Sequence, residues 1–241
     1  MRVFKCYATE RSGHHSVMFW LLHQNKKVEG YESYGKFDPV IRCDQPNYQA
    51  VLFDNLAIDQ SYLGGKNNPP YKTNDNKLKL VILGYERCKI SELQNHIFIN
   101  YETICGKNID TKEIIILRDF KNTIASLVNK CRNHQIPNPK MTIPIWKDRA
   151  QAILSHKYYF INYNKYNSDI NYRQQVCIDL GLEFTDIAFD YLTPSGGGSS
   201  FDSKTGFNTR YKQLQNSHGF YQTLKEYSDC VELSKEIFGN V

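Results

Sequence analysis

Short apolar runs recur along the chain, separated by stretches whose apolar residues are spaced as in helices. Runs rich in Val, Ile, Phe, Leu and Tyr lie at 2–8, 78–85, 114–117 and 158–163. Runs of this length and composition predict β-strands. A wholly apolar run such as 114–117 is typical of a central strand in a parallel sheet that is covered on both faces.

Helices are predicted between and after these strands. The apolar stretch 17–22 is too continuous for an exposed helix face, so it predicts a buried helix. Further helices are expected over 121–131, 143–156, 172–180 and from about 210 onward. Asp119 is suited to cap one helix and Gly181 to end another. The alternation of strands and helices predicts an α/β fold with a central parallel sheet flanked by helices.

Length and composition indicate one globular domain. The chain has 241 residues, of which 41% are hydrophobic and 23% charged, and this suits a single domain over 1–241. The segment 27–77 is rich in Asn, Tyr, Gly and Pro and predicts long loops. The segment 194–212 is also predicted to be a loop, because it begins with a Gly- and Ser-rich stretch.

Charge and cysteine content exclude several classes of protein. The net charge of +5 suits an anionic ligand but gives no indication of nucleic acid. No apolar run reaches about 18 residues, so no membrane span is expected. The N-terminal residues lack the apolar stretch of a signal peptide, and the seven scattered cysteines form no CxxC motif. We therefore expect reduced thiols and a cytoplasmic location.

The segment 10–16, Glu-Arg-Ser-Gly-His-His-Ser, lies between the first predicted strand and the first predicted helix. Backbone N–H groups at such a helix N-terminus bind anions. Gly13 allows the backbone to approach a phosphate closely, and Arg11 offers a fixed positive charge. Ser12 and Ser16 offer hydroxyl groups. The plainer interpretation is a strand-to-helix turn with Ser12 as its cap.

The same segment departs from the ATP-binding P-loop pattern GxxxxGK[ST]. When Gly13 is aligned with the second Gly, His14 falls at the Lys and His15 at the residue that holds Mg²⁺. The lysine that reaches the β- and γ-phosphates is therefore missing, which disfavours a kinase. A P-loop small-molecule kinase stays as an alternative, and it would depend on ATP and magnesium.

A second motif follows the apolar run 114–117. The strand delivers Arg118 to its carboxyl end, and the next predicted helix carries Ser126. One guanidinium and one hydroxyl can hold a phosphate through charge-assisted hydrogen bonds. The alternative is that Arg118 pairs with Asp119 or with a helix end and that Ser126 is a small packing residue.

These motifs resemble the phosphate-binding motifs of sulfotransferases that use 3′-phosphoadenosine 5′-phosphosulfate (PAPS). In that family Lys/Arg-Ser-Gly-Thr-Thr binds the 5′-phosphosulfate, and a strand ending in Arg, followed by a helical Ser, binds the 3′-phosphate. The resemblance implies a P-loop-like three-layer sandwich. It also implies that the 5′-phosphosulfate is bound by Arg11, Ser12, Gly13, His14, His15 and Ser16, and the 3′-phosphate by Arg118 and Ser126.

The segment 195–202, Ser-Gly-Gly-Gly-Ser-Ser-Phe-Asp, resembles the loop that closes over the nucleotide in bacterial and carbohydrate-type members. The resemblance implies nucleotide contacts from Gly197, Gly198, Ser199, Ser200, Phe201 and Arg210. It also places 27–77 on the acceptor side as a variable insert. A flexible linker is the alternative interpretation of the glycine-rich loop.

Sulfuryl transfer to a hydroxyl is an in-line displacement that needs a base and cations on the leaving phosphate. Glu86 directly follows the strand 78–85, and the family carries its base at the end of that strand, so Glu86 is the favoured base. Arg11 is expected to stabilise the leaving group. His14, His15 and Asp54 are rival bases. The plainer interpretation is that Glu86 pairs with Arg87 or with a surface lysine.

The sequence therefore predicts a sulfotransferase that uses PAPS, releases 3′-phosphoadenosine 5′-phosphate (PAP) and requires no metal. A metal site at the two histidines is disfavoured because the sequence offers no second ligand cluster. The expected acceptor is a small molecule or carbohydrate with a hydroxyl or amine group. A non-catalytic nucleotide-binding protein on a degenerate sulfotransferase scaffold is the remaining alternative.

Overall fold

The computed structural model of the chain describes residues 2–24, 41–42, 80–86, 89–93, 110–132, 139–186, 189, 208–214 and 217–239. Most of the predicted insert 27–77 and most of the predicted loop 194–212 lie outside these ranges.

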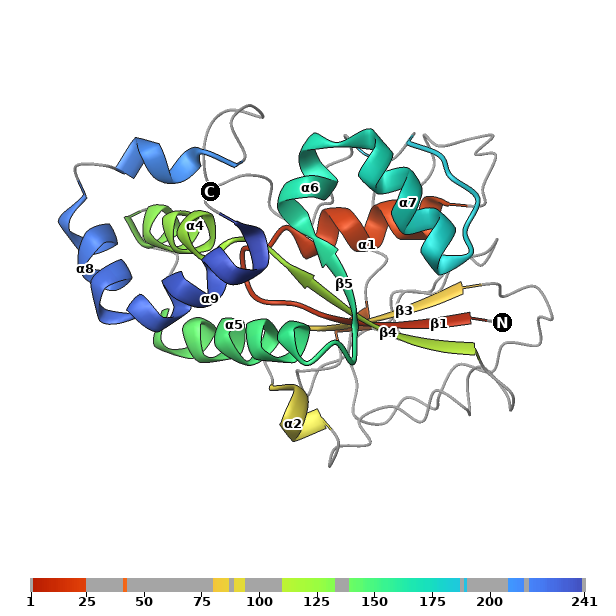
Figure 1. Ribbon diagram of the computed structural model, residues 1–241, viewed down its shortest axis with the longest axis horizontal. Helices are drawn as coiled ribbons and strands as arrows, with labels where there is room; N and C mark the ends of the chain where they lie inside the picture. Colours follow the sequence, from red (N-terminus) through yellow and green to blue (C-terminus); the bar gives the residue numbers. More distant parts are fainter. Residues whose placement is uncertain are drawn as a thin grey trace, which may run out of the picture.

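A parallel β-sheet forms the centre of the molecule (Figure 1). Its strands are β1 (Arg2–Tyr7), β2 (Ile41–Arg42), β3 (Leu80–Tyr85), β4 (Asp110–Leu117) and β5 (Tyr159–Asn162). They lie in the order β2-β3-β1-β4-β5, and every neighbouring pair is parallel. This arrangement confirms the predicted α/β fold with a central parallel sheet.

Helices flank the sheet on both faces (Figure 1). They are α1 (His14–His23), α2 (Ile90–Leu93), α4 (Phe120–Arg132), α5 (Pro139–Leu154), α6 (Tyr163–Ser168), α7 (Ile170–Leu180), η4 (Arg210–Leu214), α8 (His218–Glu226) and α9 (Ser228–Phe238). Gly181 ends α7 in the left-handed conformation with φ of 64°, as predicted. The strand predicted over 158–163 stops earlier, because the Asn162 side chain accepts a hydrogen bond from Lys165 N and begins α6.

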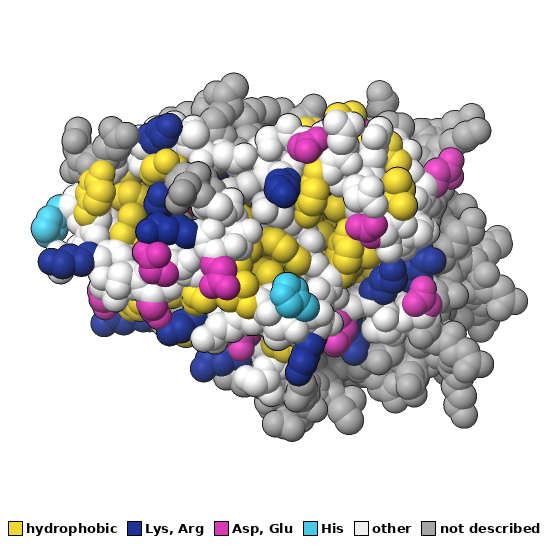
Figure 2. All heavy atoms as spheres, in the orientation of Figure 1, with side chains coloured by type: hydrophobic (Ala, Val, Ile, Leu, Met, Phe, Trp, Pro, Cys, Tyr) yellow, Lys and Arg dark blue, Asp and Glu magenta, His cyan; other side chains and the backbone are white. Residues whose placement is uncertain are grey.

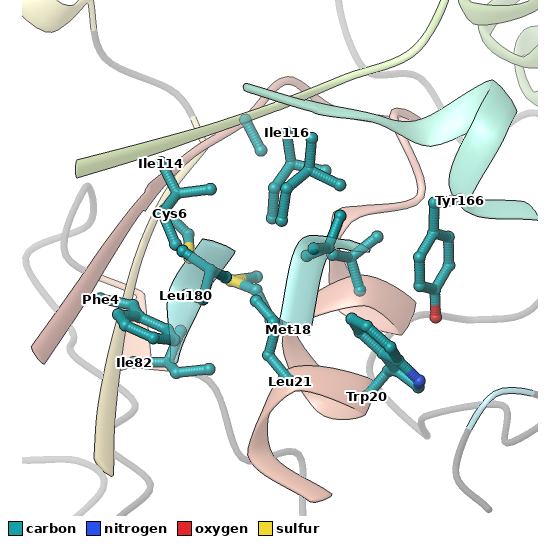
Figure 3. Close-up of a cluster of buried hydrophobic side chains, with 14 of the residues drawn as sticks. Phe4, Cys6, Met18, Trp20, Leu21, Ile82, Ile114, Ile116, Tyr166 and Leu180 are labelled. Carbon is teal, nitrogen blue, oxygen red and sulfur yellow. The ribbon is translucent and has the colours of Figure 1, made fainter. Parts of the chain in front are cut away.

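The alternating side chains of β4 show how the sheet is buried on both faces. Ile114 and Ile116 belong to one core, which β1 also enters and which α1, α6 and α7 complete (Figure 3). Ile115 and Leu117 point to the opposite core, which contains residues of α4, α5, α8 and α9. Wholly apolar strands are what a sheet between two helical layers requires. The helix predicted at 17–22 packs into the first core with Val17 to Leu21 almost fully buried.

The outer surface of α5, α8 and α9 carries charges of both signs (Figure 2). Lys147 forms an ion pair with Asp229, and Lys235 with Glu232. Interspersed charges of this kind are typical of a solvated helical surface. Among the described residues, no helix is long and apolar enough to cross a membrane.

Candidate anion-binding site

The candidate site lies at the carboxyl edge of the sheet. β1 is paired with β3 on one side and with β4 on the other. The chain places β2 and β3 on one side of β1 and then β4 and β5 on the other, so the strand order reverses at β1. Ligands of open parallel sheets bind at such a point. The three segments that leave β1, β3 and β4 there carry Arg11, Glu86 and Arg118. The structure thus brings together residues that the sequence analysis selected from separate motifs.

The turn after β1 is tight and contains two residues with left-handed backbone angles. Ala8 N donates a hydrogen bond to Tyr85 O (2.9 Å), and Ser12 N donates to Thr9 O (3.2 Å). Arg11 has a left-handed φ of 66°, and Gly13 a φ of 79°. Gly13, and not Ser12, is the residue that caps α1, and it makes no side-chain cap hydrogen bond. The predicted strand-turn-helix is confirmed, while the interpretation of Ser12 as the helix cap is wrong.

Gly13 also lies directly against an aromatic ring. A Cβ atom built on Gly13 would lie 2.2 Å from Tyr163 Cε2. Tyr163 is buried at the start of α6, and its ring stacks on Tyr166 at 5.9 Å between centroids. From the sequence, Gly13 is expected to allow close approach of a phosphate. The structure gives a further reason for a glycine at this position, because Tyr163 of α6 occupies the space that a side chain on residue 13 would need.

Three arginines converge on the turn. Arg11 Nε donates a hydrogen bond to Ser126 Oγ on α4 at 3.0 Å, which joins the two predicted phosphate motifs. Arg118 is 3% exposed, and its guanidinium lies 5.6 Å from the centroid of the Tyr163 ring. Arg210, at the start of η4, is also 3% exposed. Buried cations that lie close together are favourable only when an anion offsets their charge.

The pKa values of these arginines report their burial and their mutual repulsion. Burial and then the charge of Arg118 lower the pKa of Arg11, although Glu10 and Glu86 oppose this effect. Burial lowers the pKa of Arg118, against the opposing influence of Tyr163 and Asp119. Burial, Arg118 and Arg11 lower the pKa of Arg210 to about 10. A guanidinium keeps its charge in proteins, so the site holds three cations, with the carboxylates of Glu10, Glu86 and Asp119 near enough to interact with them, and it suits an anionic ligand.

A buried amide-carboxylate network positions Arg210. Asp119 accepts hydrogen bonds from Asn122 N, Asn122 Nδ2 and Asn164 Nδ2, each at 2.9 Å. Asn122 Nδ2 also donates to Asn208 O (2.9 Å), and Asn122 Oδ1 accepts from Tyr211 N (3.3 Å). Asn208 Nδ2 donates to Asn164 O at 3.1 Å. These contacts connect α4 and α6 to the segment on either side of Arg210, so they fix where η4 begins.

Little of this network could be predicted from the sequence. The sequence indicates Asp119 as a helix cap, and the hydrogen bond from Asn122 N confirms that role. The spacing of Asp119 and Asn122 is a signal for a local contact at the start of a helix. No comparable local signal exists for Asn164 and Asn208, because their contacts join segments that are far apart in the sequence.

His14, His15 and Glu86 form a compact group beside the arginines. His14 Nε2 lies 3.5 Å from Glu86 Oε1, and His14 Nδ1 lies 3.2 Å from Ser12 Oγ. The His14 and His15 rings are 4.2 Å apart between centroids, at an interplanar angle of 43°. Glu86 and His15 are each 9% exposed and His14 is 4% exposed. A largely buried carboxylate next to an imidazole can accept or hold a proton.

Of the remaining predicted site residues, the structure describes Ser16 and Ser126. The Ser16 hydroxyl lies 3.5 Å from Tyr166 Oη, so its contact is with α6. Ser126 is buried and accepts from Arg11, so it is more than a small packing residue. The predicted site residues outside the described residues are Gly197, Gly198, Ser199, Ser200, Phe201 and the rival base Asp54.

The family of this chain is open. No protein-family model matches it, and no curated protein matches it at a significant level. The sulfotransferase resemblance therefore rests on the motifs of the sequence and carries forward as a proposal.

Proposed function

We propose that the chain is a sulfotransferase that moves a sulfuryl group from PAPS to a hydroxyl or amine acceptor. The observation that carries this proposal is the convergence of Arg11, Arg118 and Arg210 at the carboxyl edge of the sheet. PAPS carries a 3′-phosphate and a 5′-phosphosulfate, and two separate anionic groups suit a site with several buried cations. The missing P-loop lysine argues against ATP as the ligand.

In the proposed reaction, the acceptor oxygen attacks the sulfur in line with the bond to the 5′-phosphate. A new S–O bond forms, the bond from sulfur to the phosphate oxygen breaks, and PAP leaves. Glu86 receives the acceptor proton, and its carboxylate lies 3.5 Å from His14 Nε2. Arg11 stabilises the charge that develops on the leaving phosphate. Arg118 and Ser126 bind the 3′-phosphate, as the resemblance implies.

The first experiment measures thermal stabilisation by PAP, by AMP and by ATP with magnesium. A ligand at about 100 times its dissociation constant adds about 2.7 kcal/mol of stability, which a melting curve resolves. We expect a large shift with PAP and a small one with AMP, because AMP lacks the 3′-phosphate. Arg118→Ala should lose the difference between PAP and AMP.

Arg2→Ala is the matched control, because Arg2 begins β1 at the opposite edge of the sheet and pairs with Asp110 there. It should keep the full PAP shift. A shift with magnesium ATP and none with PAP would instead support the kinase. Binding of PAP without sulfation of any acceptor by wild type would support the non-catalytic alternative. Where an acceptor is found, Glu86→Gln should retain PAP binding and lose turnover by about 10²–10⁴-fold.

A further inference from the structure

We propose that His14, His15 and Glu86 form a binding site for a divalent transition metal of the zinc class. One ligand atom from each side chain lies within 4.8 Å of the other two. Two imidazoles and one carboxylate are a donor set that zinc takes in proteins, with a fourth position left open. Magnesium and calcium prefer oxygen ligands, so this set excludes them as the preferred ions.

The contact between His14 and Glu86 has the length of a shared metal ion. Two ligands at about 2.0–2.1 Å from a tetrahedral zinc ion lie about 3.3 Å apart. His14 Nε2 and Glu86 Oε1 are 3.5 Å apart, close to that separation and long for a charge-assisted hydrogen bond. The third ligand is His15, which offers a ring nitrogen within 4.8 Å of the ligand atoms of His14 and Glu86.

Ser12 gives His14 the outer contact that metal-binding histidines require. Metal-ligating histidines usually donate their other ring N–H to a neighbouring acceptor, which fixes the ring and its tautomer. Ser12 Oγ lies 3.2 Å from His14 Nδ1, so Nδ1–H can donate to the hydroxyl. In that tautomer the lone pair of Nε2 faces the Glu86 carboxylate, and a cation between them is favourable.

The neighbouring arginines oppose a dication, and this determines how the ion binds. Arg11 lies near enough to Glu86 for the two charges to interact. An anion at the open metal position offsets this repulsion, so inorganic phosphate should strengthen metal binding. Because binding of the two ligands is reciprocal, the metal should strengthen phosphate binding by the same factor.

A consequence for catalysis rests on the proposed function. Glu86 is the proposed base, and a carboxylate that ligates a metal is less able to accept a proton. Zinc should therefore inhibit sulfation, and a chelator should restore it. Metal binding itself is independent of whether PAPS is the donor.

The test is a titration of the full chain with Co²⁺, followed by the visible absorption of the bound ion. We expect one Co²⁺ per chain, with the intense visible bands of tetrahedral geometry. His15→Gln and Glu86→Gln should each weaken binding at least about tenfold, and Ser12→Ala by about 10–100-fold through loss of the outer contact. His218→Gln is the control, because His218 is exposed at the start of α8.

Two results would overturn the proposal. One is a Co²⁺ titration in which His15→Gln and Glu86→Gln bind like wild type while their melting curves are native. The other is a thiolate-to-cobalt charge-transfer band, which would assign the ion to cysteines. PAP shifts measured on the same samples separate this outcome from the proposed function, since either ligand can bind when the other does not.

Discussion

The left-handed backbone at Arg11 determines where its side chain lies. A non-glycine residue in this conformation costs about 1–2 kcal/mol, and such strain persists only where surrounding contacts compensate for it. Arg11 has φ of 66° and donates from Nε to Ser126 Oγ across the carboxyl edge of the sheet. The strained residue thus links the two predicted phosphate motifs, and backbone strain of this kind is concentrated at functional sites.

The first prediction concerns Gly13. Gly13→Ala should lower the free energy of unfolding by about 1–3 kcal/mol, because the new Cβ would lie 2.2 Å from the Tyr163 ring at a φ of 79°. Urea denaturation measures this loss. Gly219→Ala is the control, because nothing lies within 4 Å of its Cβ position in α8. It should raise stability by about 0.4–1 kcal/mol, and equal effects of the two changes would contradict the packing at Gly13.

The second prediction concerns the cost of gathering buried cations. Arg210→Met should raise the free energy of unfolding without ligand by about 0.5–2 kcal/mol, because it removes a charge repelled by Arg118 and Arg11. The same variant should bind PAP more weakly.

Arg173→Met provides the comparison for Arg210→Met. Arg173 donates from Nη2 to Asp186 Oδ2 at 2.6 Å and from Nη1 to Tyr166 O at 2.7 Å. Its removal should cost about 3–5 kcal/mol, because it leaves a partly buried carboxylate without its cation. Chemical denaturation of both variants checks the contrast. A loss of stability in Arg210→Met as large as that in Arg173→Met would indicate a structural role for Arg210.

At the scale of elements, the start of α4 helps to position both Arg118 and Arg210. Trp146 Nε1 on α5 donates to Arg118 O at 2.9 Å, at the entry to α4. Asn122, in the first turn of α4, contacts both Asn208 and Tyr211 around Arg210. The start of one helix therefore fixes Arg118 and the beginning of η4 together, which is the kind of outer support that a precise binding site needs.

The third prediction tests this support. Asn122→Asp keeps the shape of the side chain but places a carboxylate against the Asp119 carboxylate and the Asn208 carbonyl. It should lower the free energy of unfolding by about 1–3 kcal/mol and weaken PAP binding through displaced η4. Asn171→Asp is the matched control on the exposed first turn of α7, where a negative charge is acceptable. Its stability should change by less than about 0.5 kcal/mol, and an equally mild Asn122→Asp would remove the network as a support.

The elements that sequence predicted well are those whose signal is local. The apolar run in β4 and the glycine at 181 identify a buried strand and a helix end without any tertiary information. The helix α6 was missed because its aromatic residues continue the pattern of the strand before it, and only the Asn162 cap marks the change. Motif order also placed Arg11, Glu86 and Arg118 at one edge, because parallel strands end together.

The parts of the site that sequence did not predict depend on distant contacts. The pairing of Arg11 with Ser126 spans 115 positions, and the contact of Asn122 with Asn208 spans 86. No local propensity records such pairs, since they arise only when the layers pack. The same holds for Tyr163 against Gly13, which a glycine pattern alone attributes to a ligand.

At the scale of the whole molecule, tyrosine hydroxyls and cysteine thiols in or beside both cores have raised pKa values. Burial raises the pKa of Tyr172, of Cys177 and of Cys230, each to about 12. Burial also raises the pKa of Tyr7, and a hydrogen bond to Glu113 raises it further. These groups lie on both faces of the sheet, so their titration affects both cores.

The fourth prediction is that alkali unfolds the protein. When the pKa of an acid is higher in the folded state than in the unfolded state, the unfolded chain loses its proton first as the pH rises. The free energy of unfolding therefore falls above the unfolded pKa. The stabilisation from Cys177, Cys230 and Tyr172 is complete below about pH 9 and is lost as the pH rises toward 12. Each group should contribute about 1.4 kcal/mol per pH unit in that window. Arg11, Arg118 and Arg210 act in the opposite direction because their pKa values are lowered, but the acids with raised pKa values outnumber them.

Urea midpoints at a series of pH values from neutral to strongly alkaline measure this slope. Cys177→Ala removes one of the titrating groups, so its free energy of unfolding should fall less steeply with pH than that of wild type. The number of protons released on unfolding should differ between the two by up to one. Each variant is compared with its own value at neutral pH, because the lost packing of the Cys177 side chain lowers stability at every pH. Parallel slopes for wild type and Cys177→Ala would mean that this thiol titrates alike in both states, which would contradict its burial in the core that contains Ile114 and Ile116.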